Sequence, residues 1–173
     1  MVHTNKTLNS HLSLLSQEHQ TLNFHLQVKT KLEALKEILP WFDHTVKPLL
    51  GEKCAWQCQL LLVEAFTNAV RHAHHNLPDQ TPIDLEATLD ANYLEMRIID
   101  RGQPFDLTAE LARRLTQKQD TCGKVESLAE GGRGLIWIQE LSDRLDYIRL
   151  PNQHNCLIIG KNLADSGETS HLN

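Results

Sequence analysis

The chain has 173 residues, of which 40% are hydrophobic and 23% charged, and its formal net charge is −5 at pH 7. This length suits one domain with a hydrophobic core, and an acidic chain without a Lys/Arg-rich run is not expected to bind nucleic-acid phosphates. No apolar run reaches the roughly 18 residues of a membrane span, and the start, MVHTNKTLNS, lacks the cationic flank and apolar block of a signal peptide. We therefore predict a cytoplasmic protein with neither a membrane nor a nucleic acid as a partner.

The cysteines and histidines of the sequence do not predict a transition-metal site. The four cysteines include no C-x-x-C pair, and a reducing cytosol favours free thiols for all of them: Cys54, Cys58, Cys122 and Cys156. The densest group of histidines is His72, His74 and His75. Only His72 and His75 could share a helix face, and no third ligand is evident.

The first elements are predicted from periodicity. Residues 1–20 form a polar N-terminal extension, in which three scattered leucines leave a short amphipathic helix and an irregular segment both open. Residues 22–28 alternate apolar and polar side chains, which predicts a half-buried strand. Apolar residues then recur at helical spacing over 32–42, and Pro40 is expected to end or kink that helix because it lacks an N–H donor.

A longer helix is predicted from about Glu52 to near Asn76. Within it, LLLVEAFTNAVRHA (60–73) places Glu64 and Asn68 one turn apart on the same face, between apolar neighbours. A carboxylate and a carboxamide in so narrow a polar stripe favour a groove over bulk water. The alternative is an ordinary polar helix face.

Residues 83–89 and 94–98 alternate on either side of Ala91-Asn92, which predicts a hairpin with one apolar face. Helices covering that face alone would make an α+β fold with an antiparallel sheet. Asp100 has the strand parity of the apolar residues of 94–98, so its carboxylate should point toward the helices and needs a partner there. The alternative is an Asp that begins a turn and bonds its own backbone.

The second half of the chain completes the pattern. An amphipathic helix is predicted over 108–120 with Thr108 as its cap, followed by an aperiodic stretch, 121–130, and a glycine-rich run that leads into another helix. Two strands, 145–150 and 156–161, close the domain, and residues 163–173 are predicted to be a disordered tail.

Three short motifs now stand in order: E-x-x-x-N at 64–68, D-x-G at 100–102 and G-x-G at 132–134. With these motifs the chain resembles the GHKL (Bergerat-fold) ATPases over roughly residues 21–162. The surrounding EAFTNAVRHA, DRGQPFD and GGRGLIWIQELSD are most similar to the anti-sigma-factor serine/threonine protein kinases of that superfamily. The resemblance implies a two-layer α/β sandwich with a mixed, mostly antiparallel sheet and helices on one face. It also implies that the aperiodic stretch 121–130 is a lid over the nucleotide.

The resemblance assigns a role to each motif residue. Glu64 is the expected catalytic base, and Asn68 offers a neutral oxygen to Mg²⁺. The Asp100 carboxylate can accept a hydrogen bond from an adenine amino group, while Gly102 lets a flat base approach the backbone. A glycine run at a helix N-terminus suits the phosphates of ATP. His72 matches a histidine of the family's extended first motif. The remaining cofactor-binding candidates are therefore His72, Gly131, Gly132, Arg133, Gly134 and Leu135.

The implied function is an ATP-dependent serine/threonine protein kinase that acts as an anti-sigma factor. It would phosphorylate a small anti-anti-sigma (antagonist) protein and sequester a sigma factor, and homodimers are common in the family. Pro104 stands where many GHKL members have a second glycine, D-x-G-x-G, which favours the anti-sigma branch. The alternative is a non-catalytic module of the same fold that holds a partner under nucleotide control, although retention of Glu64 favours the kinase.

Overall fold

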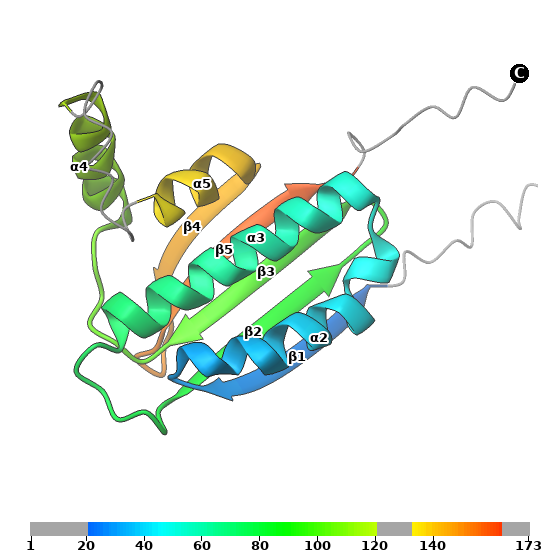
Figure 1. Cartoon of the computed structure of the whole chain (residues 1–173), viewed down its shortest axis with the longest axis horizontal. Helices are drawn as coiled ribbons and strands as arrows, with labels where there is room; N and C mark the ends of the chain where they lie inside the picture. The colour runs from blue at the N-terminus through cyan, green and yellow to red at the C-terminus, as the bar shows by residue number, and fades with distance from the viewer. Residues whose placement is uncertain (1–20, 121–132, 164–173) are drawn as a thin grey trace, which may run out of the picture.

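The computed structural model describes residues 21–120 and 133–163 (Figure 1). The N-terminal extension, the proposed lid at 121–130, the first two residues of the glycine box (Gly131 and Gly132) and almost all of the tail lie outside the described residues.

A five-stranded sheet forms one layer of the fold. Its order is β1-β2-β3-β5-β4, and all four pairings are antiparallel. The α+β class is therefore confirmed, and no parallel pair occurs among the described strands. The strands are β1 (Leu22–Lys29), β2 (Pro82–Leu89), β3 (Tyr93–Asp100), β4 (Arg144–Arg149) and β5 (Asn155–Asn162).

Helices α2 and α3 lie side by side over the same face of the sheet, and α5 packs along α3 (Figure 1). Short 3-10 helices, Leu32–Ala34 and Lys47–Leu49, flank α2, and α3 continues directly into a π-helix, Ala69–Ala73. The α-helices are α2 (Leu35–Thr45), α3 (Glu52–Asn68), α4 (Leu107–Asp120) and α5 (Gly134–Leu141). No helix of the described segments combines the length and apolar character needed to cross a membrane.

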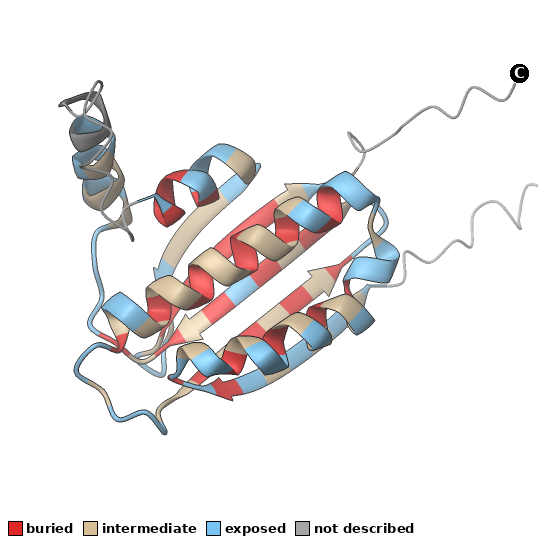
Figure 2. Cartoon of the chain, in the orientation of Figure 1, coloured by how far each residue is buried: buried red, intermediate tan, exposed pale blue. Residues whose placement is uncertain are grey.

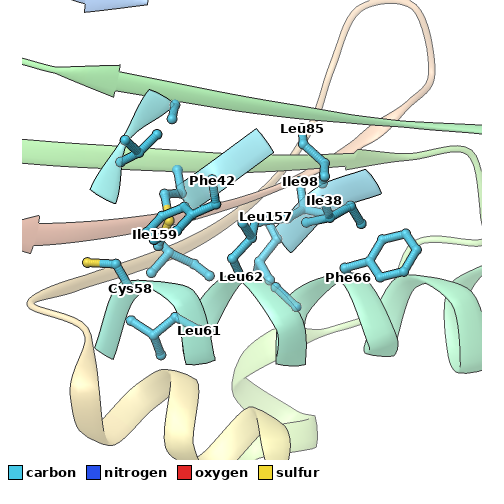
Figure 3. Close-up of a cluster of buried hydrophobic side chains, with 14 of the residues drawn as sticks. Ile38, Phe42, Cys58, Leu61, Leu62, Phe66, Leu85, Ile98, Leu157 and Ile159 are labelled. Atoms are coloured by element: carbon cyan, nitrogen blue, oxygen red, sulfur yellow. The ribbon is translucent and has the colours of Figure 1, made fainter. Parts of the chain in front are cut away.

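The core lies between the two layers. Buried and less buried residues alternate strictly along β2, as the period of a strand requires (Figure 2). Figure 3 shows side chains of α2 and α3 meeting those of the sheet, among them Phe42, Phe66 and Ile98. Full burial of each such side chain contributes about 1.5–3 kcal/mol, so this cluster holds α3 firmly in place over β3 and β5.

Two local details differ from the expectations. Of the two outcomes expected at Pro40, an end or a kink of the helix, the structure excludes the end. Helix α2 does not end at Pro40 but runs through it to Thr45. Proline removes one backbone hydrogen bond on the exposed side of the helix, while Ile38 and Phe42, both 0% exposed, hold the helix onto the sheet. Helix α4 is capped by Asp106 instead of Thr108, because the Asp106 Oδ1 accepts the backbone N–H of Ala109 at 2.9 Å.

Candidate functional site

A cavity of about 550 Å³ opens between the C-terminal half of α3, the sheet and α4. This volume is in the usual range for small-molecule sites. Asn68, His72, Asp100 and Leu135 line the cavity, so the structure brings together a residue from each of the first two motifs and the leucine that directly follows the third. The other described candidates, Glu64, Gly102, Arg133 and Gly134, lie outside the lining.

The end of α3 places two of these side chains. Asn68 is the last α-helical residue, and His72 follows within the π-helix, whose wider turn is closed by the His74 N–H donating to the Ala69 carbonyl at 2.9 Å. Single π-turns inside helices occur frequently at functional sites. His72 is exposed, and desolvation together with the nearby Arg114 charge lowers its pKa, which favours the neutral ring.

Asp100 is only 5% exposed, as its strand parity predicted. Its Oδ1 accepts two hydrogen bonds, from the Gly102 N–H at 2.8 Å and from the Asn155 Nδ2 at 2.8 Å. The interpretation of Asp100 as a residue that bonds its own backbone is therefore confirmed for Oδ1. Oδ1 closes a turn with its own backbone, whereas no hydrogen bond to Oδ2 is formed within the described residues. A contact of Oδ2 with a ligand stays a prediction.

Asn155 is a site residue that the sequence did not indicate. It is 0% exposed, and its Nδ2 also donates to the Gly102 carbonyl at 3.0 Å, while its Oδ1 accepts from Arg149. Asn155 lies directly opposite Asp100 in the β3–β5 ladder. An asparagine with the inward parity of Leu157 was the available signal, but its partner is 55 residues away in sequence.

Gly102 is needed for packing. A Cβ at this position would lie 2.2 Å from the Ala73 carbonyl oxygen, so any side chain would collide with the backbone that ends the π-helix. The absence of a side chain therefore lets the D-x-G turn contact the end of that helix. A direct approach of a base to Gly102 stays a prediction.

Glu64 lies one turn before Asn68, on the side of α3 that faces α5. A Cβ on Gly134, the first residue of α5, would lie 2.2 Å from the Glu64 Oε2, so the glycine makes room for this carboxylate. Desolvation raises the pKa of Glu64, and the charge of Arg71 opposes that rise in part. Arg133 is exposed just before α5, whereas Gly134 and Leu135 are buried.

Helix α4 adds charged side chains that no motif indicated. Glu110, Arg113 and Arg114 all line the cavity. Glu110 accepts from Arg113 at 2.7 Å and from Arg114 at 2.6 Å, and these bonds, that to Arg113 foremost, lower its pKa to about 2. With Asp106, which also lines the cavity, the formal charges of this wall balance. The two guanidinium groups are nevertheless hydrogen-bond donors of the kind that suits phosphates.

A buried histidine, His74, forms a hydrogen bond with the backbone of the D-x-G turn. The Arg101 N–H donates to the His74 Nε2 at 2.8 Å, and the Thr30 hydroxyl lies 2.6 Å from both the His74 Nδ1 and the Thr81 carbonyl. Because Thr30 must donate its single proton to that carbonyl, His74 carries its proton on Nδ1. Desolvation lowers the pKa of His74. The charge of Asp100 raises this pKa in part, and the charge of Arg101 lowers it further.

This network makes stability pH-dependent. The pKa of His74 is lower in the folded chain than in the unfolded one, so its contribution is complete above about pH 6.5 and is lost as the pH falls. In His74→Gln, Oε1 can still accept from Arg101, but the bond to Thr30 is lost, which should cost about 1–2 kcal/mol at pH 7.5. Thermal unfolding of both proteins should be measured between pH 7.5 and 5.5. The difference in stability between the wild type and His74→Gln should become smaller toward pH 5.5. A difference that stays the same at every pH would contradict the role of His74.

The fold and the cavity together define an α+β domain with a small-molecule site between one long helix and an antiparallel sheet. Comparison with known families makes this specific: the family model for the histidine kinase-like ATPase domain matches residues 28–161, and the chain belongs to that family. Family membership identifies a nucleotide-binding domain and confirms the resemblance seen in the three motifs.

Among solved structures, the chain is similar to one in the crystal structure of the SiaB-SiaC complex from Pseudomonas aeruginosa. The TM-score is 0.52 with 11% sequence identity, and the match covers 92% of this chain and 99% of that one. At this identity the likeness concerns the fold. No curated protein matches the chain significantly.

Proposed function

We propose that the chain is an ATP-dependent serine/threonine protein kinase that acts as an anti-sigma factor. It phosphorylates a small antagonist protein and, when that protein does not occupy it, sequesters a sigma factor in the cytoplasm. One observation carries the catalytic part: Asn68 and Asp100 line a single cavity, and Glu64 lies one turn before Asn68 in α3.

The lining of the cavity supports ATP as the nucleotide, with the base and the phosphates at opposite ends. At the inner end, the Asp100 Oδ2 is an acceptor without a donor, which suits the exocyclic amino group of adenine. Toward Asn68, the cavity meets Leu135 in the first turn of α5 and the arginines of α4. Guanidinium donors and a helix N-terminus both favour phosphates, so the triphosphate would run from Asp100 toward α5.

Asn68 is the residue that would hold Mg²⁺. Mg²⁺ prefers hard oxygen ligands and keeps several waters, so one side-chain oxygen and the oxygens of the triphosphate suffice. Bound there, the ion would neutralise phosphate charge during transfer. Among residues 21–120 and 133–163, no cluster of three or more His, Cys, Asp or Glu side chains forms a separate metal site.

Glu64 is the proposed general base. It takes the proton from the acceptor Ser or Thr hydroxyl as that oxygen bonds to the γ-phosphorus, while the bond to the β–γ bridging oxygen breaks and ADP leaves. Desolvation raises the pKa of Glu64 and makes it a better proton acceptor than an exposed carboxylate. Gly134 leaves the space in which this carboxylate lies.

The partners follow from the resemblance to anti-sigma kinases. One solved structure that shares the fold is a complex of two proteins, SiaB and SiaC, which is consistent with a small protein partner for this chain. A homodimer is a further assembly implied by the resemblance.

One observation favours a second function. Glu64 does not line the cavity, so the chain could bind nucleotide and hold its partner without phosphorylating it. In this non-catalytic, nucleotide-gated module, Asn68 and Asp100 keep their roles and Glu64 is a structural neighbour of Gly134.

Nucleotide binding itself is the first test. Calorimetric titration of the folded protein with ATP and Mg²⁺ should give saturable heat that weakens when Mg²⁺ is replaced by a chelator. Absence of heat at millimolar ATP, with folding verified by circular dichroism, would remove both proposed functions together.

A further inference from the structure

Strand β1 forms one edge of the sheet. In the order β1-β2-β3-β5-β4 it has β2 on one side, and all eight of its residues take part in that pairing (Figure 1). The described residues supply no strand on its other side. An edge of this length presents a row of backbone N–H and C=O groups with which another strand can pair.

The apolar side of β1 is incompletely covered. Leu22, Phe24 and Leu26 point toward the helices yet are only half-buried, whereas every residue of β2 that points the same way is buried (Figure 2). Natural sheets often protect such an edge with a proline or with a charged residue that points inward. Strand β1 has neither, so it has the features of a strand that pairs with another chain.

Helix α2 adds a tryptophan beside this edge. Asp43 accepts a hydrogen bond from Gln59 of α3 at 3.2 Å, so this side of α2 faces α3. Trp41 lies two residues earlier, about 200° around the helix, and therefore on the side away from α3, above β1, against which α2 packs (Figure 1). Trp41 is half-buried, and the exposed Glu37 and His44 flank it, one turn to either side.

We propose that β1 and the Trp41 side of α2 form the interface of a homodimer, in which the β1 strands of two copies pair antiparallel about a two-fold axis perpendicular to the sheet. The two sheets then continue into one, and the helices of both copies lie on the same side of it. Each copy covers the half-buried apolar side chains of the other. The inference rests on the homodimer included in the proposed function and names the surface that forms it, and it does not require nucleotide binding.

The charges of this interface suit a second copy of the same chain. A two-fold contact is isologous, so it sets one patch against itself. In the antiparallel α2 pair, Glu37 of one copy approaches His44 of the other, because Trp41 lies between these residues near the axis. In β1 the one lysine, Lys29, is at the end of the strand, so antiparallel strands keep the two lysines apart. Like charges therefore do not oppose the association.

The wild type supplies the first measurement. Sedimentation at micromolar concentration should give a mass near twice the 19.7 kDa of one chain. Hydrogen exchange of residues 22–29 should be slower at concentrations where the dimer forms than after dilution, because the free backbone groups of the edge become paired. Residues 144–149, which form the opposite edge of the sheet, should exchange at the same rate at both concentrations.

Leu26→Lys tests the interface directly, because it places an inward-pointing charge on the edge strand. A lysine there can extend past the free edge into water in the monomer, but the dimer would bury one such charge from each copy. The dissociation constant should rise at least roughly 100-fold. Circular dichroism and titration with Mg·ATP verify that the variant remains folded.

Ile148→Lys is the matched control. It makes the same kind of change on β4, the other edge strand, at a residue that is 43% exposed. This variant should remain dimeric, because β4 lies at the far side of the sheet from β1.

A concentration-dependent dimer that only Leu26→Lys dissociates supports the inference. A monomeric wild type overturns it, including one in which residues 1–20 cover the edge and 22–29 exchange slowly at every concentration. A dimer that survives Leu26→Lys, or that is lost in Ile148→Lys, forms through another surface and also overturns it. If Leu26→Lys does not fold, the exchange of the wild type decides. A dimeric wild type that does not bind ATP would overturn the proposed kinase and leave this interface standing.

Discussion

Glu64→Gln should lower the rate of phosphoryl transfer about 10²–10⁴-fold, the usual cost of removing a general base, while affinity for Mg·ATP stays at the wild-type level. Glutamine keeps the shape of the side chain beside Gly134 but cannot take a proton. Because Glu64 lies outside the cavity lining, nucleotide binding has no reason to change. The readout is transfer of labelled γ-phosphate to the antagonist protein, obtained by copurification from the protein's own cells and identified by mass spectrometry.

Asn68→Ala is the comparison for this experiment, since Asn68 does line the cavity. Removal of the proposed Mg²⁺ ligand should reduce metal-dependent ATP affinity and transfer together. If Glu64→Gln transfers phosphate at the wild-type rate, or if the wild type binds ATP and its partner yet transfers nothing, the base assignment is wrong. The nucleotide-gated binding module would then replace the kinase.

Asp100→Asn is expected to have the second largest effect, a loss of ATP affinity of about 1.5–3 kcal/mol, the range for a hydrogen bond to a charged group. The carboxamide oxygen of the variant can still accept from Gly102 and Asn155, as Oδ1 does now. Its NH₂ group then stands where Oδ2 faced the cavity, so a donor meets the amino donor of adenine. Guanine has a carbonyl at that position, so the substitution should reduce the affinity for GTP less than the affinity for ATP.

The measurement is calorimetric titration with ATP and with GTP. Asp146→Asn provides a control with the same chemical change, because Asp146 lies on the opposite face of the sheet in an exposed ion pair with Arg144. Its affinity for ATP should equal that of the wild type. Equal ATP and GTP affinities in Asp100→Asn and the wild type would show that Asp100 is not the partner of adenine.

Regular elements could be predicted because their signals are local. The alternation in 22–28 and in the 83–98 hairpin, and the helical spacing around Glu64, each follow from burial of one face of one element. The same parity rule predicted that Asp100 is buried, and the structure confirms it. The helix does not end at Pro40 because the packing of Ile38 and Phe42 against the sheet outweighs one missing hydrogen bond.

By itself, then, the sequence determined the α+β class, the family through three ordered motifs, and the inward direction of Asp100. Only the tertiary structure decided which other side chains meet these motifs. Asn155 meets Asp100 through the pairing of β5 with β3. Tyr147 reaches the cavity through the pairing of β4 with β5, and the arginines of α4 reach it through the docking of that helix. Such contacts join residues far apart in the chain. No periodicity within one element reports them, because they depend on how the elements pack together.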